Sequence, residues 1–505
     1  MADLASEEKI EAAQTNERKQ TAAEDDMKRR DFTKLAGVVT LAAFAAPALI
    51  RRTAAQGVAP NVGRGTYLIN NGAVITVDPS KGTLPRADVL VRNGVIERVG
   101  TGITASGVEV IDAADMIVMP GFVDTHYHMW SAVGRSFTAS KEGFSYFPAK
   151  FATSALYTPD DFYASVLLAS VELANAGTTT VHNWDHNTRT PAHADAELRA
   201  HRDSLLRARY AYGHIDRLPP DQVNTYSDIP RVQKEWFGQG SPLNGLVHLG
   251  LNLRGTIQSD EATFHKEMEF VKKSGLPVAI HASQEAPNVC DAVDYEKRGY
   301  LGPKFLIAHY IPARVEDLEA MARTNTPLAF STHSELRLSG TGDARAALLR
   351  MRAARVNVSL SSDATSIAPP NMFEMMRLTW NLGVPWKGTE NEGENPVGVH
   401  EVIEMATING AKALGLGEVT GSLTEGKRAD IILIRTKDVN VAPVGNIETA
   451  VVQTVTPANV DTVIIDGRIV KRSGRLTAYD MPMIIDEAEK AASGIRKKAG
   501  DLLKF

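Results

Sequence analysis

Short apolar runs alternate with longer helix-like stretches throughout residues 117–415. Apolar runs bounded by turn residues predict buried strands, whereas EATFHKEMEFVKKSG (261–275) has the apolar spacing typical of a helix. Strands are predicted at 117–126, 177–185, 208–214, 246–254, 276–282, 304–309, 326–332 and 355–363. Eight strand-plus-helix units predict an α/β fold, a TIM-type (β/α)₈ barrel. An open doubly wound sheet is less favoured, because no Gly-x-Gly-x-x-Gly motif follows the first strand.

A second pattern, of short strands separated by tight turns, flanks this middle part on both sides. It occupies residues 66–120, where Asn71-Gly72 and Asn93-Gly94 are hairpin turn signals, and it returns at 429–476. We therefore predict one small β-sandwich built from both chain ends. The predicted domains are the sandwich at 56–116 and 416–480, the barrel at 117–415 and a C-terminal helix at 481–505.

The first 55 residues predict an export signal rather than part of the fold. Residues 1–26 are polar and charged, which is typical of disorder, and Arg29-Arg30 precedes the apolar stretch 35–50. This stretch is short for a membrane span, and the arginine pair resembles a twin-arginine signal, with a cleavage site near Ala55. We expect a periplasmic or extracellular protein with no stable membrane partner after cleavage. A membrane anchor or a basic linker is the alternative.

Composition excludes some classes of function. The chain has 505 residues and a formal net charge of −5, with no basic stripe, so we expect no nucleic-acid partner. Its one cysteine, Cys290, excludes an internal disulfide and a site built from several cysteines.

Candidate chemistry appears where the predicted barrel strands end. GFVDTHYHMW (121–130) places His126 and His128 two residues apart, so both imidazoles point the same way on a strand. Later strands end at His281, His309 and Asp363. Each histidine alone is more often structural, but five such groups at one barrel mouth predict a metal site, because clustered imidazoles would otherwise lack partners.

These groups suit one divalent ion, most simply Zn²⁺, with Fe²⁺ or Mn²⁺ as alternatives. His126, His128, His281 and Asp363 are the predicted ligands, and a bound water would be activated for attack. Asp363 is expected to move the proton, and His309 to polarise the target or the water.

Two segments closely resemble the amidohydrolase superfamily, in its chlorotriazine-hydrolase and aminohydrolase-like branch. They are MPGFVDTHYH (119–128) and ATINGAKALGLGEVTGSLTEGKRADIILI (406–434). The resemblance implies the same ligands, with His309 catalytic and Asp363 as ligand and base, and it implies a homodimer. Family members with two metals usually carry a bridging lysine or a glutamate at the fourth strand. Residues 247–255, VHLGLNLRG, contain neither, so one metal is expected.

The sequence departs from the resemblance after His281. Ring deaminases and dechlorinases of this family typically carry His-x-x-Glu, but this chain reads His281-Ala-Ser-Gln284. Glutamine cannot carry a proton, which favours hydrolysis of an amide, urea or carbamate C–N bond in a small molecule. Deamination or dehalogenation of a heteroaromatic ring is the first alternative. A non-catalytic barrel scaffold and a lyase or isomerase are the others.

Loops after the strands carry the predicted substrate contacts. They are Trp130, Gln284, His186 and Glu335. For each of them, stabilisation of a loop is an equally good interpretation.

Overall fold

Residues 62–139, 145–224, 226–282, 290–338, 342–384 and 396–503 are described by the computed structural model. The chain divides into two compact units, 1–56 and 57–505, and all described residues belong to the second. The predicted export signal and the predicted substrate residue Gln284 lie outside the described residues.

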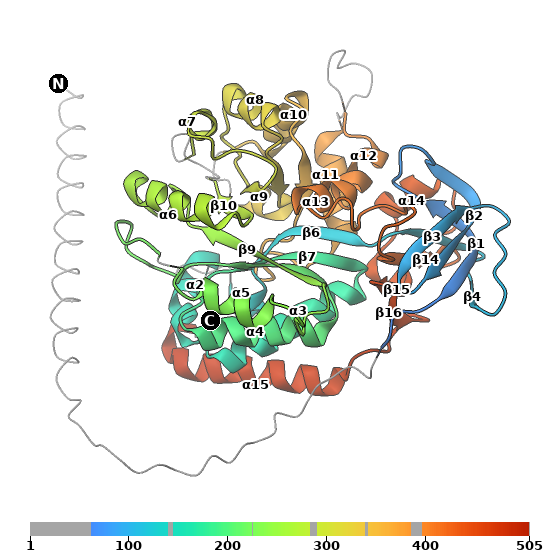
Figure 1. Cartoon of the computed structure of the whole chain (residues 1–505), viewed down its shortest axis with the longest axis horizontal. Coiled ribbons are helices and arrows are strands. Elements are labelled where there is room, and N and C mark those ends of the chain that lie inside the picture. The colour runs from blue at the N-terminus through green and yellow to red at the C-terminus, as the bar shows by residue number, and fades with distance from the viewer. Residues whose placement is uncertain are drawn as a thin grey trace, which may run out of the picture. The chain divides into compact units, whose positions relative to one another are not determined.

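Eight parallel strands pair in chain order and form the barrel wall (Figure 1). They are β6 (Phe122–Tyr127), β7 (Thr178–Asp185), β8 (Arg207–Tyr212), β9 (Val247–Leu253), β10 (Val278–His281), β11 (Phe305–Ala308), β12 (Leu328–Phe330) and β13 (Val358–Leu360). Six of them lie within a predicted segment, and β6 and β8 each extend one residue beyond theirs, so the predicted (β/α)₈ barrel is confirmed.

The barrel closes between its last and first strands. The Asp363 N–H donates to the carbonyl of His126 at 2.8 Å, and the His128 N–H donates to the carbonyl of Asp363 at 2.7 Å. The Thr125 hydroxyl donates to the Leu360 carbonyl at 2.9 Å. The closing backbone bonds therefore join residues that the sequence predicts as metal ligands.

Helices connect the strands and cover the barrel (Figure 1). They are α2 (Tyr146–Thr153), α3 (Pro159–Asn175), α4 (Pro191–Ser204), α5 (Ile229–Trp236), α6 (Glu261–Ser274), α7 (Ala292–Lys297), α8 (Val315–Arg323), α9 (Thr332–Leu338), α10 (Ala344–Ala353), α11 (Met372–Gly383), α12 (Val399–Met405) and α13 (Ile408–Ala413). The short 3₁₀ helix η1 (Met129–Gly134) follows the first barrel strand.

A nine-stranded mixed sheet is built from both ends of the described chain, in agreement with the predicted second β unit. Its strands are β1 (Tyr67–Ile75), β2 (Thr83–Arg92), β3 (Val95–Gly100), β4 (Glu109–Asp112), β5 (Met116–Pro120), β14 (Ile431–Arg435), β15 (Val460–Ile465), β16 (Arg468–Arg472) and β17 (Arg475–Leu476). Helix α14 (Ile447–Gln453) lies between β14 and β15 in the chain. Strand β14 pairs with β5, which joins the two chain segments in one sheet.

One predicted strand, 117–126, is two strands in different sheets. Strand β5 pairs with β14 in the mixed sheet and β6 opens the barrel, with Gly121 between them. A Cβ at Gly121 would overlap the Thr179 side chain, so only glycine fits this crossing. Both strands are apolar and largely buried, which is why the pattern gives no sign of the change of sheet.

The C-terminal helix α15 (Met481–Ala499) is anchored outside the barrel. Its apolar residues Ala488, Ala491 and Ile495 share a cluster with Trp130 and Phe162. Asp480 caps the start of the helix by accepting from the Met483 N–H. The helix therefore supports the segment that follows the first barrel strand.

A buried ion-pair network joins the amino-terminal end of the barrel to the mixed sheet. Arg207, the first residue of β8, lies 2.8 Å from Asp430 and 3.3 Å from Asp466. Asp466 also pairs with Arg428 and with Arg468. Both carboxylates are buried, so this network offsets their desolvation with several partners.

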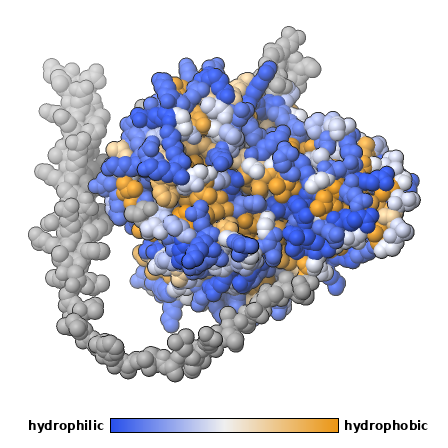
Figure 2. Space-filling model, viewed as in Figure 1, coloured by the Kyte–Doolittle hydropathy of each residue, from blue (hydrophilic) through white to orange (hydrophobic). Residues whose placement is uncertain are grey.

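The surface in Figure 2 intersperses hydrophilic and apolar residues. The large apolar side chains that are most exposed are scattered along the chain: Val110, Phe147, Val315, Leu336, Val439, Ile485 and Leu502. Single exposed apolar residues are normal on globular proteins. Within the described ranges, every helix is too short or too polar to cross a bilayer.

Candidate metal centre

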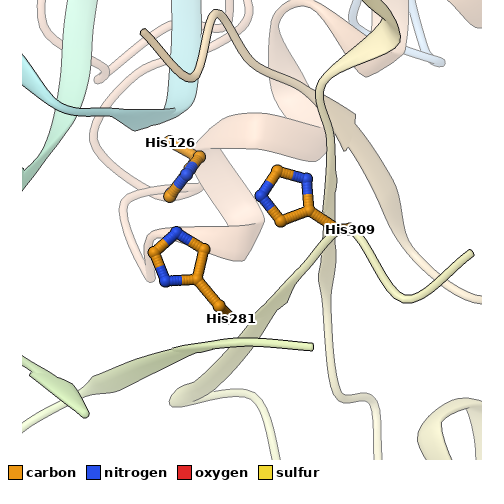
Figure 3. A group of neighbouring side chains, drawn as sticks. All are labelled: His126, His281 and His309. Atoms are coloured by element: carbon orange, nitrogen blue, oxygen red, sulfur yellow. The ribbon is translucent and has the colours of Figure 1, made fainter. Parts of the chain in front are cut away.

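Four barrel strands deliver five predicted site residues to one place at the carboxyl ends of the strands. The Nε2 atoms of His126 and His128 each lie 3.3 Å from Asp363 Oδ1. The His281 ring centroid is 4.9 Å from that of His126 and 5.5 Å from that of His309. Figure 3 shows the imidazoles of His126, His281 and His309 turned toward one another. The structure therefore brings all five residues together.

The backbone at two of these residues is strained. His309 and Asp363 have φ values of 73° and 62°, in the left-handed region that residues with a Cβ rarely adopt. Such a conformation costs about 1–3 kcal/mol and persists only where the surrounding structure enforces it. Backbone hydrogen bonds hold both residues in this conformation. Asp363 makes the two bonds that close the barrel, and the His309 N–H donates to the Ala329 carbonyl at 3.0 Å.

The donor set fits a tetrahedral metal ion. A tetrahedron with bonds of about 2.05 Å has edges of about 3.3 Å, and 3.3 Å is the distance from Asp363 Oδ1 to each first-strand imidazole. Both ring nitrogens of His126 and the Nδ1 of His281 are buried without a hydrogen-bond partner among the described residues. A bound cation would satisfy such atoms, because buried polar groups otherwise carry a desolvation cost.

Burial also keeps the imidazoles in the form that binds metals. It lowers the pKa of His126, and it lowers those of His128 and His281 well below the usual value. Burial raises the pKa of Asp363, but the neighbouring imidazoles of His126, His128 and His309 outweigh burial and hold that pKa well below the usual value. The site thus offers neutral imidazoles and one carboxylate at neutral pH.

His309 differs from the other imidazoles because it has a carboxylate behind it. Its Nδ1 donates to Glu335 Oε1 at 2.9 Å, and Glu335 also accepts from the Ser331 N–H at 3.1 Å. Burial lowers the pKa of His309, but the Glu335 charge outweighs it and raises the pKa to about 9. The Glu335 charge therefore favours the protonated imidazole, and His309 Nε2, 3.9 Å from Asp363 Oδ2, faces the centre of the site.

Three predicted substrate residues have positions that the sequence did not reveal. Glu335 is fully buried behind His309 and holds that ring, and its direct contact with a substrate stays a prediction. The His186 ring lies behind His128, with 3.1 Å between their Nδ1 atoms. Trp130 packs on Phe162, and its indole N–H donates to His186 at 3.1 Å. Direct contact of Trp130 or His186 with substrate stays a prediction.

Several residues around the site were missed by the sequence analysis. Asp124 Oδ1 accepts from the backbone N–H groups of His126 and Ser362, at 3.2 and 3.1 Å, and so ties the first strand to the last. Asp216 and Lys150 lie 3.2 Å apart beside His186. Asp216 follows the third barrel strand, and that position was the one available signal for it.

A small pocket adjoins this cluster. Its lining includes Trp130, Tyr146, Lys150 and Ser366, which lies three residues after Asp363. Burial raises the pKa of Tyr146 well above the usual value, and the charge of Asp363 raises it further.

The comparisons with known proteins agree with this geometry. The sequence profile of the amidohydrolase family matches residues 117–470. The 5'-deoxyadenosine deaminase of Methanosarcina mazei is 28% identical over 438 residues, which cover 84% of this chain and 97% of the relative. The 5-methylthioadenosine/S-adenosylhomocysteine deaminase of Desulforudis audaxviator is 29% identical, covering 84% of this chain and 98% of the relative.

Two solved structures share the fold. The adenosine deaminase of Xanthomonas campestris with bound zinc superposes with a TM-score of 0.72 at 19% identity, covering 85% of this chain and 98% of its own. The atrazine chlorohydrolase of Arthrobacter aurescens TC1, complexed with zinc, gives a TM-score of 0.73 at 19% identity, covering 84% of this chain and 100% of its own.

Proposed function

The chain belongs to the amidohydrolase family, and from this premise we propose that it is a metal-dependent hydrolase that cleaves a C–N bond of a small molecule. The observation that carries the proposal is the convergence of His126, His128, His281 and Asp363 beside His309. A non-catalytic scaffold would have no need to keep these groups together at the cost of two strained residues.

Each residue has a defined part in the reaction. His126, His128, His281 and Asp363 would hold one divalent ion. When bound, that ion would lower the pKa of a water to about 7 and polarise the scissile bond. Asp363 Oδ2 accepts the proton of the attacking water and later returns it to the leaving nitrogen. The His309 Nε2–H stabilises negative charge as it develops, since Glu335 keeps the imidazole protonated.

We propose more specifically that the substrate is an amino-substituted heteroaromatic ring, so that the C–N bond that is cleaved joins the amino group to the ring. Both curated relatives named above are deaminases of adenosine derivatives, and each match spans almost the whole relative.

An acyl C–N bond is the second candidate, as in an amide, urea or carbamate. It is favoured by Gln284, which occupies the position of the family's proton-carrying glutamate. An acyl bond needs only the activated water, a polarising group and one proton carrier, which Asp363 and His309 supply.

One experiment tests both candidates. The zinc-loaded protein is incubated with adenosine derivatives, aminotriazines, amides, ureas and carbamates, and ammonia or amine release is measured. We expect ammonia from an amino-heteroaromatic compound and none with Asp363→Asn. Turnover of acyl compounds alone would select the second candidate, and the absence of both zinc binding and turnover would contradict the hydrolase.

We also propose that residues 1–55 direct export by a twin-arginine-like route. The support is the Arg29-Arg30 pair ahead of the apolar stretch 35–50. A reporter fused after residue 61 should leave the cytoplasm, and replacing both arginines by lysine should retain it. Unchanged export of the lysine variant would contradict this route.

A homodimer, which the family resemblance implies, is a further proposal. Sedimentation equilibrium should give twice the mass of one chain, and the mass of a single chain would contradict it.

A further inference from the structure

Two side chains that the proposed reaction does not use, Trp130 and His186, meet behind the metal ligand His128. Trp130 Nε1 lies 3.1 Å from His186 Nδ1, and His128 Nδ1 lies 3.1 Å from the same atom. All three side chains are at most 4% exposed. One nitrogen of His186 is therefore the meeting point of two other ring nitrogens, in a place where water has little access.

The chemistry of indole decides where the protons are. Tryptophan can only donate, so His186 Nδ1 must carry a lone pair. If His128 Nδ1 also carried a lone pair, two acceptors would face each other at 3.1 Å. His128 Nδ1 must therefore carry the proton, which leaves the lone pair of this neutral imidazole on Nε2. That atom lies 3.3 Å from Asp363 Oδ1, and a cation bound between them would give both lone pairs a partner.

The other nitrogen of His186 faces the carboxylate of Asp216. With Nδ1 unprotonated, a neutral His186 carries its proton on Nε2, which lies 3.3 Å from Asp216 Oδ1. The same carboxylate oxygen lies 3.2 Å from Lys150 Nζ. Asp216 is buried, so the Lys150 ammonium supplies the charge that keeps an ionised carboxylate stable there.

We propose that Trp130, His186, Asp216 and Lys150 form a positioning chain that fixes His128 as the tautomer with its proton on Nδ1 and its Nε2 aimed at the metal. The proposal rests on the proposed function only in taking His128 as a metal ligand. The four residues come from η1, the ends of β7 and β8, and α2, so the chain also couples the loops around the pocket to the metal centre. They are positioning residues, because they act on the ion through His128.

The first test measures the tautomer without metal or substrate. Nitrogen-15 NMR of the histidine-labelled full chain, in its metal-free form, should show His128 protonated at Nδ1. In His186→Phe, which removes the acceptor, the His128 signals should shift toward a mixture of the two tautomers. A metal-free wild type with the His128 proton on Nε2 would overturn the proposal.

The second test measures zinc affinity by competition with a chelator. His186→Phe should weaken zinc binding by about 10- to 100-fold. His186→Gln should recover most of the affinity, because its amide oxygen can accept from His128 Nδ1–H. Asp216→Ala should weaken binding less than His186→Phe does, and it still tests the chain if His186→Phe fails to fold.

His214→Phe is the matched control. His214 is buried at the same rim, 5.9 Å from the His186 ring, but its Nε2 lies 3.1 Å from Gln258 Oε1. The zinc affinity of the His214→Phe variant should stay within about twofold of the wild type, since the contact between His128 and His186 is kept. Equal weakening by His214→Phe and His186→Phe, or unchanged affinity in His186→Phe, would overturn the positioning chain. A wild type that binds no zinc would instead contradict the proposed function, and the NMR result would still decide the tautomer.

Discussion

The barrel carries a buried polar cluster at each end, and the two clusters differ in whether their polar groups find partners within the protein. At the amino-terminal end, Arg207 meets Asp430 and Asp466 at 2.8 and 3.3 Å, and further arginines complete the pairing. At the mouth, His126 has buried nitrogens without a hydrogen-bond partner among the described residues, and Asp363 has a strained backbone. The charges of the first cluster are paired by its own residues, whereas the polar atoms of the second need a bound ion as their partner.

This difference separates stability from chemistry. In TIM-type barrels, groups at the carboxyl ends of the strands carry the reaction, and groups at the opposite end carry stability. Changes at the mouth should therefore reduce turnover and leave folding intact, and changes at the opposite end should do the reverse. Four predictions test this separation, in order of decreasing expected effect.

The largest effect is expected from Asp363→Asn. Loss of the carboxylate removes a metal ligand and the proton acceptor together, so kcat should fall about 10³-fold or more. The far-UV circular dichroism and the urea unfolding midpoint should stay close to wild type, because the backbone bonds that close the barrel are kept. Loss of the folded state would show that the mouth also carries stability.

Arg207→Met should have the opposite signature. It leaves Asp430 buried with one cationic partner fewer, which should lower the free energy of unfolding by about 3–5 kcal/mol. Turnover per folded molecule should not change. Urea unfolding measures the effect, with Arg202→Met as the control, since that partly exposed pair with Asp203 should contribute at most about 1 kcal/mol. If Arg207→Met and Arg202→Met lowered the free energy of unfolding equally, the buried network would have no special role in stability.

Glu335→Gln should give a smaller, purely kinetic effect. Glutamine can still accept from His309 Nδ1–H, but it lacks the charge that raises the pKa of His309 to about 9. The imidazole then loses its proton more readily, and kcat should fall about 10²-fold with little change in KM. The exposed Glu319→Gln is the control, and steady-state kinetics is the measurement. A rise in KM alone would instead support the substrate contact that the sequence suggested.

The smallest effect concerns acid stability at the amino-terminal end. Burial, together with the charges of Arg207 and Arg209, lowers the pKa of His248 from 6.5 to about 4. A lowered pKa means that the stability contributed by neutral His248 is present above pH 6.5 and is lost as the pH falls toward 4. The unfolding free energy should drop by at most about 1.4 kcal/mol per pH unit in this window. His248→Gln should flatten that slope in urea titrations, and an unchanged slope would exclude His248 as its source.

The sequence by itself determined the barrel and the types of residue at its mouth. Strand positions follow from short-range apolar patterns, and the ligands stand where those runs end, so both can be read locally. The pair at 126 and 128 could be placed on one side of a strand because the period of a strand is two. The glutamine at position 284, where the family typically has glutamate, was also visible in the sequence, since a single position of the chain shows it.

Only the tertiary structure decided what stands behind each ligand. Glu335 behind His309, Asp124 between the first and last strands, and Asp216 behind His186 are contacts between segments that are distant in the chain or separated by loops. The crossing at Gly121 was hidden for a related reason, because two buried strands of different sheets have the same apolar pattern. Local periodicity reports which face of a strand is buried, but the partner that a buried polar atom meets depends on how closure of the barrel brings strand ends together.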